Sequence, residues 1–153
     1  MLKRVALGLA LSALACVALA GSPMLETLAG KSVDAAAVPG NMLVLFWHPD
    51  CTYCMQELSA LNTSKDEALL GHVTTVALLP QENVHKGHYA LPPAALSLAS
   101  RANPMDVLER FGNEAGVLPY AVITRTDGSI CQKLMGEQDL KSLKAALAAC
   151  HIR

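Results

Sequence analysis

Two cysteines separated by two residues, Cys51 and Cys54, carry the strongest chemical signal in this sequence of 153 residues. A pair at this spacing can be a redox-active dithiol, half of a zinc site, or an inert structural disulfide. The elements that surround the pair favour one of these interpretations over the others.

The pair lies where a predicted strand runs into a predicted helix. Residues 42–47 form a continuous apolar run of strand length, and apolar residues recur at helical spacing through residues 55–61. The first sulfur would therefore lie at a helix N-terminus, where free N–H groups and the helix dipole stabilise a thiolate. This predicts that Cys51 attacks a disulfide and that Cys54, one turn later, resolves the mixed disulfide.

Metal binding is the main alternative for these side chains. A zinc site would use His48 with Cys51 and Cys54, but the sequence offers no obvious second half of the ligand set. His85 and His88 lie in a segment that we interpret as a loop, and histidines at that spacing are more commonly solvated than ligands. We expect no metal and no cofactor.

The first twenty residues are typical of an export signal. Lys3 and Arg4 precede an apolar run that is too short for a spanning helix, and the small residues Ala18 and Ala20 follow. We predict a signal peptide over residues 1–20. An uncleaved membrane anchor and a lipoprotein signal are the alternatives, and the lipoprotein match is poor.

Residues 21–153 suit one compact domain, here predicted to be a periplasmic monomer. The whole chain has a formal net charge of −1, which becomes −3 without Lys3 and Arg4. This bias is too weak to argue for nucleic acid or an anionic membrane as a partner. Four cysteines remain after the leader, and an oxidising compartment would let two disulfides persist.

The remaining pattern predicts an α/β fold. Its order is strand, helix, strand, helices, hairpin and helix, which indicates a central mixed β-sheet covered by helices on both faces. The predicted elements after the helix at 51–62 are a strand at 73–79, a loop at 81–93, helices at 94–102 and 104–111, strands at 120–124 and 130–135, and a final helix through Leu140, Leu143 and Leu147. Residues 21–39 are interpreted as a short hairpin with a helical turn at 33–37.

The run from Phe46 to Glu57 resembles the active-site segment of the thioredoxin superfamily. It is most similar to the exported TlpA/ResA-like branch, whose members have CxxCxxE after Phe-Trp. Residues 111–123 and the turn at 127–128 are similar to that branch's cis-proline strand and following hairpin. The resemblance spans residues 24–149 and implies a thioredoxin-like fold and a thiol–disulfide oxidoreductase.

The resemblance also implies roles for single residues. Pro119 would form a cis peptide beside the sulfurs, Leu118 would offer its backbone to an extended substrate, and Trp47 would belong to the same substrate-binding region. The alternatives are a proline that merely starts a strand and a generic core aromatic. Glu57, three residues after Cys54, would be linked to proton traffic at the dithiol, unless it is only a solvated helix carboxylate.

Three positions depart from the pattern of the superfamily. Leu45 stands where cytosolic thioredoxins have a buried Asp, Ser59 replaces a common Pro, and the middle pair is Thr52-Tyr53. Because the middle pair helps to set the redox potential, the direction of the reaction stays open. The first candidate is a reductase that passes electrons from a membrane-embedded thiol reductant to oxidised exported proteins, with apocytochrome c among them. The second is an oxidase or isomerase. The third is a metal-binding chaperone on the same scaffold.

Cys131 and Cys150 are predicted to form a second, structural disulfide. Five strand residues after Cys131 span about 16 Å, and twelve helical residues before Cys150 retrace about 18 Å, so the two cysteines would return to the same end. Two separate buried thiols, or a second redox pair that relays electrons to the first, are the alternatives.

Overall fold

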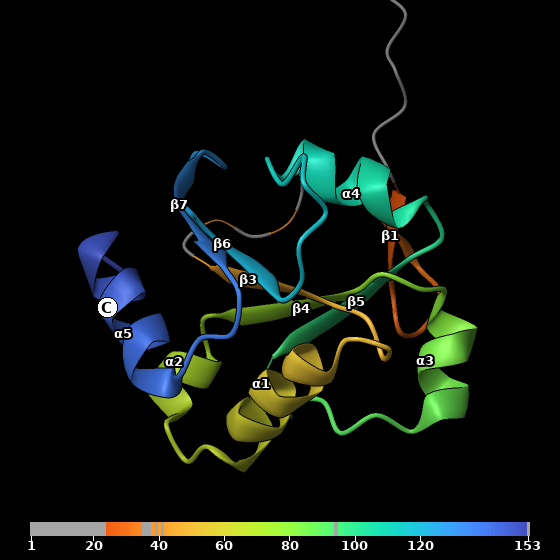
Figure 1. Ribbon diagram of the computed structural model, residues 1–153, viewed down its shortest axis with the longest axis horizontal. Helices are drawn as coiled ribbons and strands as arrows, with labels where there is room; N and C mark the ends of the chain where they lie inside the picture. The colour runs from red at the N-terminus through yellow and green to blue at the C-terminus, as the bar shows by residue number, and fades with distance from the viewer. Residues whose placement is uncertain (1–23, 35–37, 39, 41, 94, 153) are drawn as a thin grey trace, which may run out of the picture.

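A seven-stranded mixed sheet forms the centre of the protein, in the strand order β2-β1-β5-β4-β3-β6-β7 (Figure 1). The structure is a computed structural model that describes residues 24–34, 38, 40, 42–93 and 95–152. The signal peptide predicted for residues 1–20 lies outside this range. The strands are β1 (Met24–Thr27), β2 (Ser32–Asp34), β3 (Leu43–Trp47), β4 (Val73–Ala77), β5 (Leu96–Ser100), β6 (Tyr120–Thr124) and β7 (Ile130–Met135).

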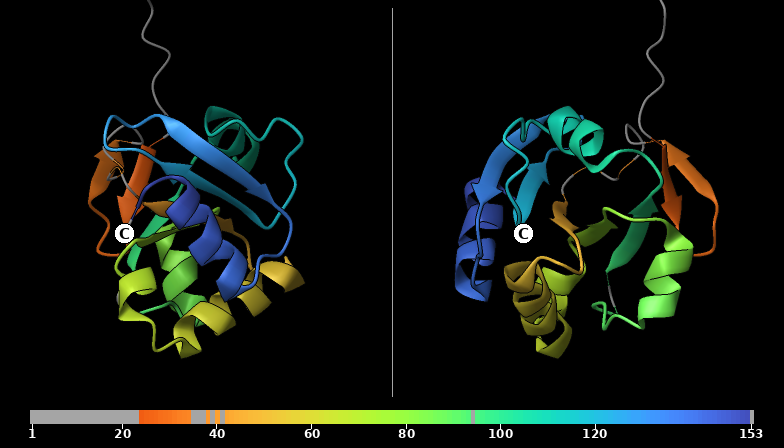
Figure 2. Two further views of the ribbon diagram at one scale, coloured as in Figure 1. Left: turned by 90° about the vertical axis from the view of Figure 1, so that its left-hand side faces the viewer. Right: turned by 45° about the vertical axis from the view of Figure 1, so that its right-hand side comes forward.

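Helices cover both faces of the sheet, which confirms the predicted fold class. They are α1 (Thr52–Thr63), α2 (Glu67–Leu70), α3 (Gln81–Gly87), α4 (Pro104–Arg110) and α5 (Leu140–Ala149). In Figures 1 and 2, α4 lies on one face and α1 on the other. Within the ranges given above, no helix is both long and apolar enough to cross a membrane.

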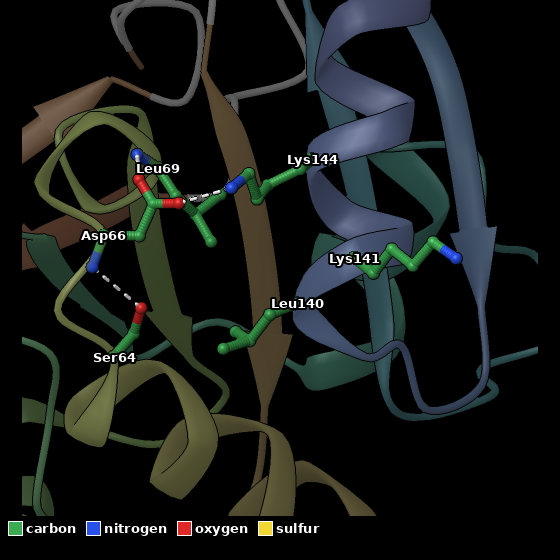
Figure 3. A pocket seen from close by; sticks show the side chains of 6 residues that line it. All are labelled: Ser64, Asp66, Leu69, Leu140, Lys141 and Lys144. Atoms are coloured by element: carbon green, nitrogen blue, oxygen red, sulfur yellow. Dashed lines mark hydrogen bonds and ion pairs between the residues drawn. The ribbon is translucent and has the colours of Figure 1, made fainter.

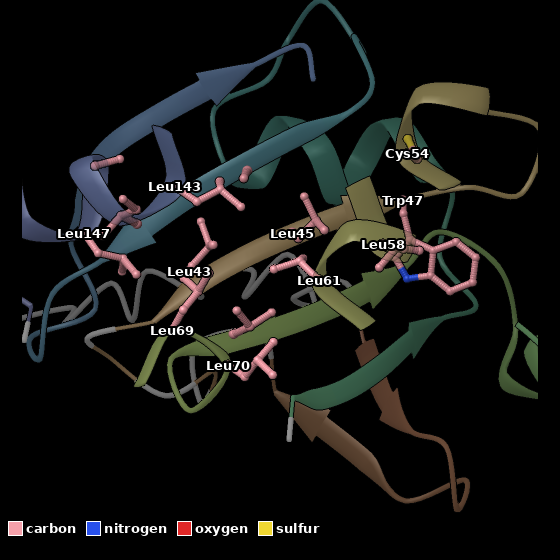
Figure 4. Close-up of a cluster of buried hydrophobic side chains, with 14 of the residues drawn as sticks. Leu43, Leu45, Trp47, Cys54, Leu58, Leu61, Leu69, Leu70, Leu143 and Leu147 are labelled. Carbon is pink, nitrogen blue, oxygen red and sulfur yellow. The ribbon is translucent and has the colours of Figure 1, made fainter. Parts of the chain in front are cut away.

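Strand β3 supplies side chains to both layers of the core because successive residues of a strand point to opposite faces. Leu43, Leu45 and Trp47 belong to the cluster under α1, α2 and α5 (Figure 4). Val44 and Phe46 belong to the cluster under α4. Since β3 pairs with β4 in parallel and with β6 antiparallel, its end is held firmly where α1 begins.

The two segments after β4 differ from the sequence-based expectation. Residues 81–87 were expected in a loop but form α3. Only Val84 of this helix is buried, so the sequence has no apolar periodicity that would indicate a helix. Residues 96–100, expected in a helix, form β5 instead, because pairing with both β1 and β4 outweighs the helical preference of Leu and Ala.

The N-terminal segment is a hairpin, as expected, formed by β1 and β2. The helical turn expected at 33–37 is wrong for its first two residues, which belong to β2, and residues 35–37 lie outside the described range. The Glu26 carboxylate ties this hairpin to α3 by accepting from the Gln81 backbone N–H at 3.0 Å, and to the residue after β5 by accepting from Arg101 Nε at 3.1 Å.

Helix α5 is fastened at two places. A disulfide joins Cys131 of β7 to Cys150 at the end of α5, with the Cα atoms 6.1 Å apart. Lys144 Nζ forms an ion pair with Asp66 Oδ2 at 2.6 Å, beside a pocket of about 290 Å³ between α2 and α5 (Figure 3). These links hold α5 against α2 and the sheet.

Candidate active site

The dithiol lies at the junction of β3 and α1. Cys51 is the N-cap residue of α1, and its sulfur accepts a hydrogen bond from the Cys54 backbone N–H at 3.1 Å. A disulfide joins Cys51 to Cys54, whose Cα atoms are 5.2 Å apart. A thiolate at Cys51 would therefore receive the stabilisation that a helix N-terminus gives to negative charge.

The two sulfurs differ in accessibility. Cys51 is half-buried, whereas Cys54 has no exposed surface and packs within the core cluster. In Figure 4, Cys54 and Trp47 lie at the same end of this cluster. A large thiol or disulfide reagent from outside can therefore reach Cys51 but not Cys54.

The turn before Cys51 is ordered by its own side chains. The Asp50 backbone N–H donates to His48 Nδ1 at 3.2 Å, and the Cys51 backbone N–H donates to the His48 carbonyl at 3.0 Å. The Asp50 side chain is 91% exposed and lies 3.5 Å from His48 Nδ1. Water screens its charge, so Asp50 opposes a thiolate at Cys51 only weakly.

The segment before β6 has a cis peptide bond between Leu118 and Pro119. The buried side chain of Asn113 holds this segment: its Nδ2 donates to the Val117 carbonyl at 2.8 Å, and its Oδ1 accepts from the Val117 N–H at 3.3 Å. Among the described residues, neither backbone group of Leu118 has a hydrogen-bond partner. Leu118 and Cys51 both pack against the core cluster that contains Cys54.

Glu57 is buried in α1, one turn after Cys54, with 2% of its surface exposed. Neither carboxylate oxygen has a hydrogen-bond partner within the described residues. The pKa of Glu57 is raised from its ordinary 4.5 to about 8, mainly because the side chain is buried. The negative charge of Glu137 raises this pKa further. The backbone of Gln138 lowers it in part, although the contact does not meet full hydrogen-bonding geometry. The solvated-carboxylate interpretation is therefore wrong, and Glu57 is a neutral acid near pH 7.

The histidines gather into no metal site within the part of the chain that the structure describes. His85 Nε2 lies 2.6 Å from the Leu28 carbonyl oxygen, which occupies that ring nitrogen. Over the part of the chain that the structure describes, no group of three or more His, Cys, Asp or Glu side chains could hold a metal ion.

Known structures resemble this architecture closely. A thioredoxin-related protein from Neisseria meningitidis serogroup B superposes with a TM-score of 0.64 at 23% identity, over 84% of this chain and 99% of that one. A thio-disulfide isomerase from Thermus thermophilus gives a TM-score of 0.63 at 22% identity, over 87% and 97%. A secreted disulfide oxidoreductase from Mycobacterium tuberculosis gives 0.57 at 21%, over 82% and 94%.

The fold is thioredoxin-like. At these identities, the superpositions establish the fold alone. No protein-family model matches the chain, and no curated protein sequence matches it.

Trp47 is buried in this thioredoxin-like fold, whereas a residue that contacts substrate has an exposed side chain. Its side chain has no exposed surface, and its ring packs against Tyr89 with centroids 5.1 Å apart. It has no exposed surface for contact with a bound polypeptide in this conformation, and its burial agrees with the alternative of a generic core aromatic. Trp47 instead forms part of the core beneath the dithiol.

Sequence reasoning missed two residues of the site. Asn113 entered the sequence analysis only within residues 111–123, although its buried side chain holds the cis-proline segment through Val117. Glu137 carried no signal, because only the fold brings the end of β7 close to α1. The turn residue Gly136, at φ 78°, could have marked this loop as one with a fixed conformation.

Proposed function

We propose that the protein is an exported thiol–disulfide oxidoreductase in which Cys51 is the attacking thiol and Cys54 the resolving thiol. The observation that carries the proposal is the unequal pair itself: an accessible sulfur at a helix N-terminus, bonded to a sulfur with no exposed surface. The fold shared with the secreted Mycobacterium tuberculosis oxidoreductase supports the same class of reaction.

In the reductive direction, the Cys51 thiolate attacks one sulfur of a substrate disulfide. The substrate S–S bond breaks, a Cys51–substrate disulfide forms, and the first substrate thiolate leaves. Cys54 then loses its proton and attacks Cys51 Sγ, which releases the second substrate thiolate and closes the Cys51–Cys54 disulfide. Two electrons pass from the dithiol to the substrate, which gains two protons.

Glu57 can exchange a proton with Cys54 during this cycle. In the oxidised protein it is the neutral acid, so it can protonate the Cys54 thiolate when a donor thiol attacks Cys51 and regenerates the dithiol. Once Glu57 is ionised, it can accept the Cys54 proton in the reverse step. An oxidised exported protein would pair its extended backbone with the free groups of Leu118, beside Pro119, while Cys51 reacts.

The partners follow from this chemistry. We propose oxidised exported proteins as substrates, apocytochrome c among them, and a membrane-embedded thiol reductant as electron donor in the periplasm. The redox potential of the Cys51–Cys54 couple tests the direction: about −270 mV or lower is expected for a reductase, and about −120 mV would make the protein an oxidase.

A trapping experiment tests the assignment of the two thiols. We expect Cys54→Ser to accumulate a mixed disulfide with substrate through Cys51, because the resolving step is lost. Cys51→Ser should trap nothing and should not reduce insulin. Trapping through Cys54 in Cys51→Ser would reverse the roles, and insulin reduction that disappears on treatment with a chelator would favour a metal-dependent function instead.

A further inference from the structure

The residue that caps α1 is not the one that capping preferences favour. Cys51 is the N-cap residue, and its sulfur accepts from the Cys54 backbone N–H. Asp50 directly precedes it, and aspartate is among the strongest N-cap residues because its carboxylate accepts from the free N–H groups of the first turn. The Asp50 side chain is nevertheless 91% exposed. The turn before α1 must therefore keep Asp50 out of the capping position.

His48 binds the backbone of this turn at two points. Its Nδ1 accepts from the Asp50 N–H at 3.2 Å, and its carbonyl accepts from the Cys51 N–H at 3.0 Å. Pro49, between them, has no N–H. Of the three residues between His48 and α1, one thus has no N–H and the other two donate to His48. Both of these bonds fix the residue at which α1 begins.

We propose that His48 is the positioning residue that makes Cys51, rather than Asp50, the cap of α1. Because its imidazole holds the Asp50 N–H, the Asp50 carboxylate stays in solvent and the helix N-terminus is left to the Cys51 sulfur. The inference rests on the proposed function, in which Cys51 is the attacking thiol, and adds how the chain prepares that thiol.

Two negative groups would otherwise compete for one helix N-terminus. If α1 began one residue earlier, the Asp50 carboxylate would accept from the N–H of Thr52 or Tyr53, the second and third residues of that helix. The Cys54 N–H would then bond the Asp50 carbonyl, four residues before it, and the Cys51 sulfur would lose this donor. A fixed carboxylate beside Cys51 would also disfavour a second negative charge there. The observed turn avoids both effects.

The contact also assigns the proton of the imidazole. A ring nitrogen that accepts a hydrogen bond carries no proton, so neutral His48 has its proton on Nε2. Asp50 Oδ2 lies 3.5 Å from the same Nδ1. A proton on Nδ1 would be donated to this carboxylate instead, and the Asp50 N–H would lose its acceptor. The proposed role therefore requires one particular tautomer.

Alkylation of Cys51 in the reduced protein tests the proposal. The rate with iodoacetamide, measured by mass spectrometry across pH, has a midpoint that reports how well the thiolate is stabilised. His48→Leu removes the acceptor, and the midpoint should rise by about half a pH unit, a threefold change, since one net hydrogen bond changes an equilibrium roughly two- to tenfold. His48→Asn should match the parent protein, because an asparagine side chain also accepts from the N–H two residues later. An unshifted midpoint in His48→Leu, or an equal shift in His48→Asn, would overturn the proposal.

A double-mutant cycle tests the competition with Asp50. Asp50→Ala removes the alternative cap, so it should lower the midpoint more in the His48→Leu background than in the parent protein. Glu109→Ala, which removes an exposed carboxylate from α4, is the matched control and should not restore the His48→Leu protein. Equal effects of Asp50→Ala in both backgrounds would overturn the competition.

Nuclear magnetic resonance tests the same inference without relying on a variant. Two-bond ¹H–¹⁵N spectra of the parent protein at pH 8 should show the His48 proton on Nε2, and a proton on Nδ1 would overturn the proposal. In His48→Leu, the Cα chemical shift of Cys51 should move toward the helical range, because Cys51 leaves its extended conformation at φ −92° and ψ 98°.

These readouts separate the inference from the proposed function. Alkylation and the His48 tautomer report on the turn whether or not the protein exchanges disulfides with other proteins. Failure of trapping, with the expected shift in His48→Leu, would refute the proposed function alone. Normal trapping with no shift in His48→Leu would refute the inference alone.

Discussion

Replacing Glu57 by glutamine should stabilise the oxidised protein in a pH-dependent way. The pKa of Glu57 is about 8 in the folded protein and 4.5 as its ordinary value. A raised pKa means that the folded state binds the proton more tightly than the unfolded state. The associated stability is fully present below about pH 4.5 and is lost as the pH rises toward 8.

The size of the effect follows from the two values. At pH 7, which is 2.5 pH units above the ordinary pKa of 4.5, the unfolded chain has lost the proton and the folded protein retains it. At about 1.36 kcal/mol per unit, the folded protein is about 3 kcal/mol less stable at pH 7 than at low pH because of this group alone. A glutamine side chain has nearly the same shape as that of glutamate and no proton to lose, so the variant escapes this loss.

Urea unfolding of the oxidised proteins at pH 4, 5.5, 7 and 8.5 measures the difference. The free energy of unfolding of Glu57→Gln minus that of the parent protein should be near zero at pH 4 and about 3 kcal/mol at pH 7, and it should level off above pH 8. Glu109→Gln, which changes an exposed carboxylate on the other face of the sheet, should track the parent. Parallel curves for Glu57→Gln and the parent would show that the carboxyl ionises freely in the folded protein, and would refute the reasoning from burial.

Two other parts of the structure give predictions of their own. Replacing both Cys131 and Cys150 by Ala should lower the free energy of unfolding by about 3 kcal/mol, the value expected for a closed loop of this length. The variant should still reduce insulin. Loss of both stability and insulin reduction would favour an electron-relay role. Asn113→Ala leaves both backbone groups of Val117 without a partner, so urea unfolding should show a loss of about 2 kcal/mol, and mixed-disulfide formation should slow. Asn113→Asp, which retains the acceptor for the Val117 N–H, should lose less of both, and equal losses would argue against the clamp.

The sequence was sufficient where the signal is local. The order of apolar run, cysteine pair and helical periodicity requires only neighbouring residues, and it placed Cys51 at the start of α1 correctly. The hairpin of β6 and β7 was predicted from the Asp127-Gly128 turn, and α4 from its cap at Asn103, which accepts from the Met105 N–H at 2.8 Å. Each of these elements is determined by contacts within a few positions along the chain.

The strand β5, expected as a helix, lies where distant pairing decides the structure. Leu96 to Ser100 become a strand only because β1 and β4 flank them, and β1 comes from the far end of the described chain. The electrostatic surroundings of Glu57 likewise depend on the loop at Glu137, eighty positions later. The spacing of Glu57 from Cys54 was visible in the sequence, but the absence of partners around its carboxylate was not.

The two disulfides illustrate how position, rather than cysteine chemistry, separates their roles. Cys51–Cys54 closes a separation of three residues at a helix N-terminus, so opening it leaves the helix and sheet in place and exposes an activated thiol. Cys131–Cys150 closes a separation of 19 between a strand and the end of a helix, and Cys150 is 7% exposed. The start of α5 lines the same pocket as Glu57, close in sequence to the Cys51–Cys54 pair. The Cys131–Cys150 disulfide therefore holds in place the helix that shapes the surroundings of the Cys51–Cys54 disulfide.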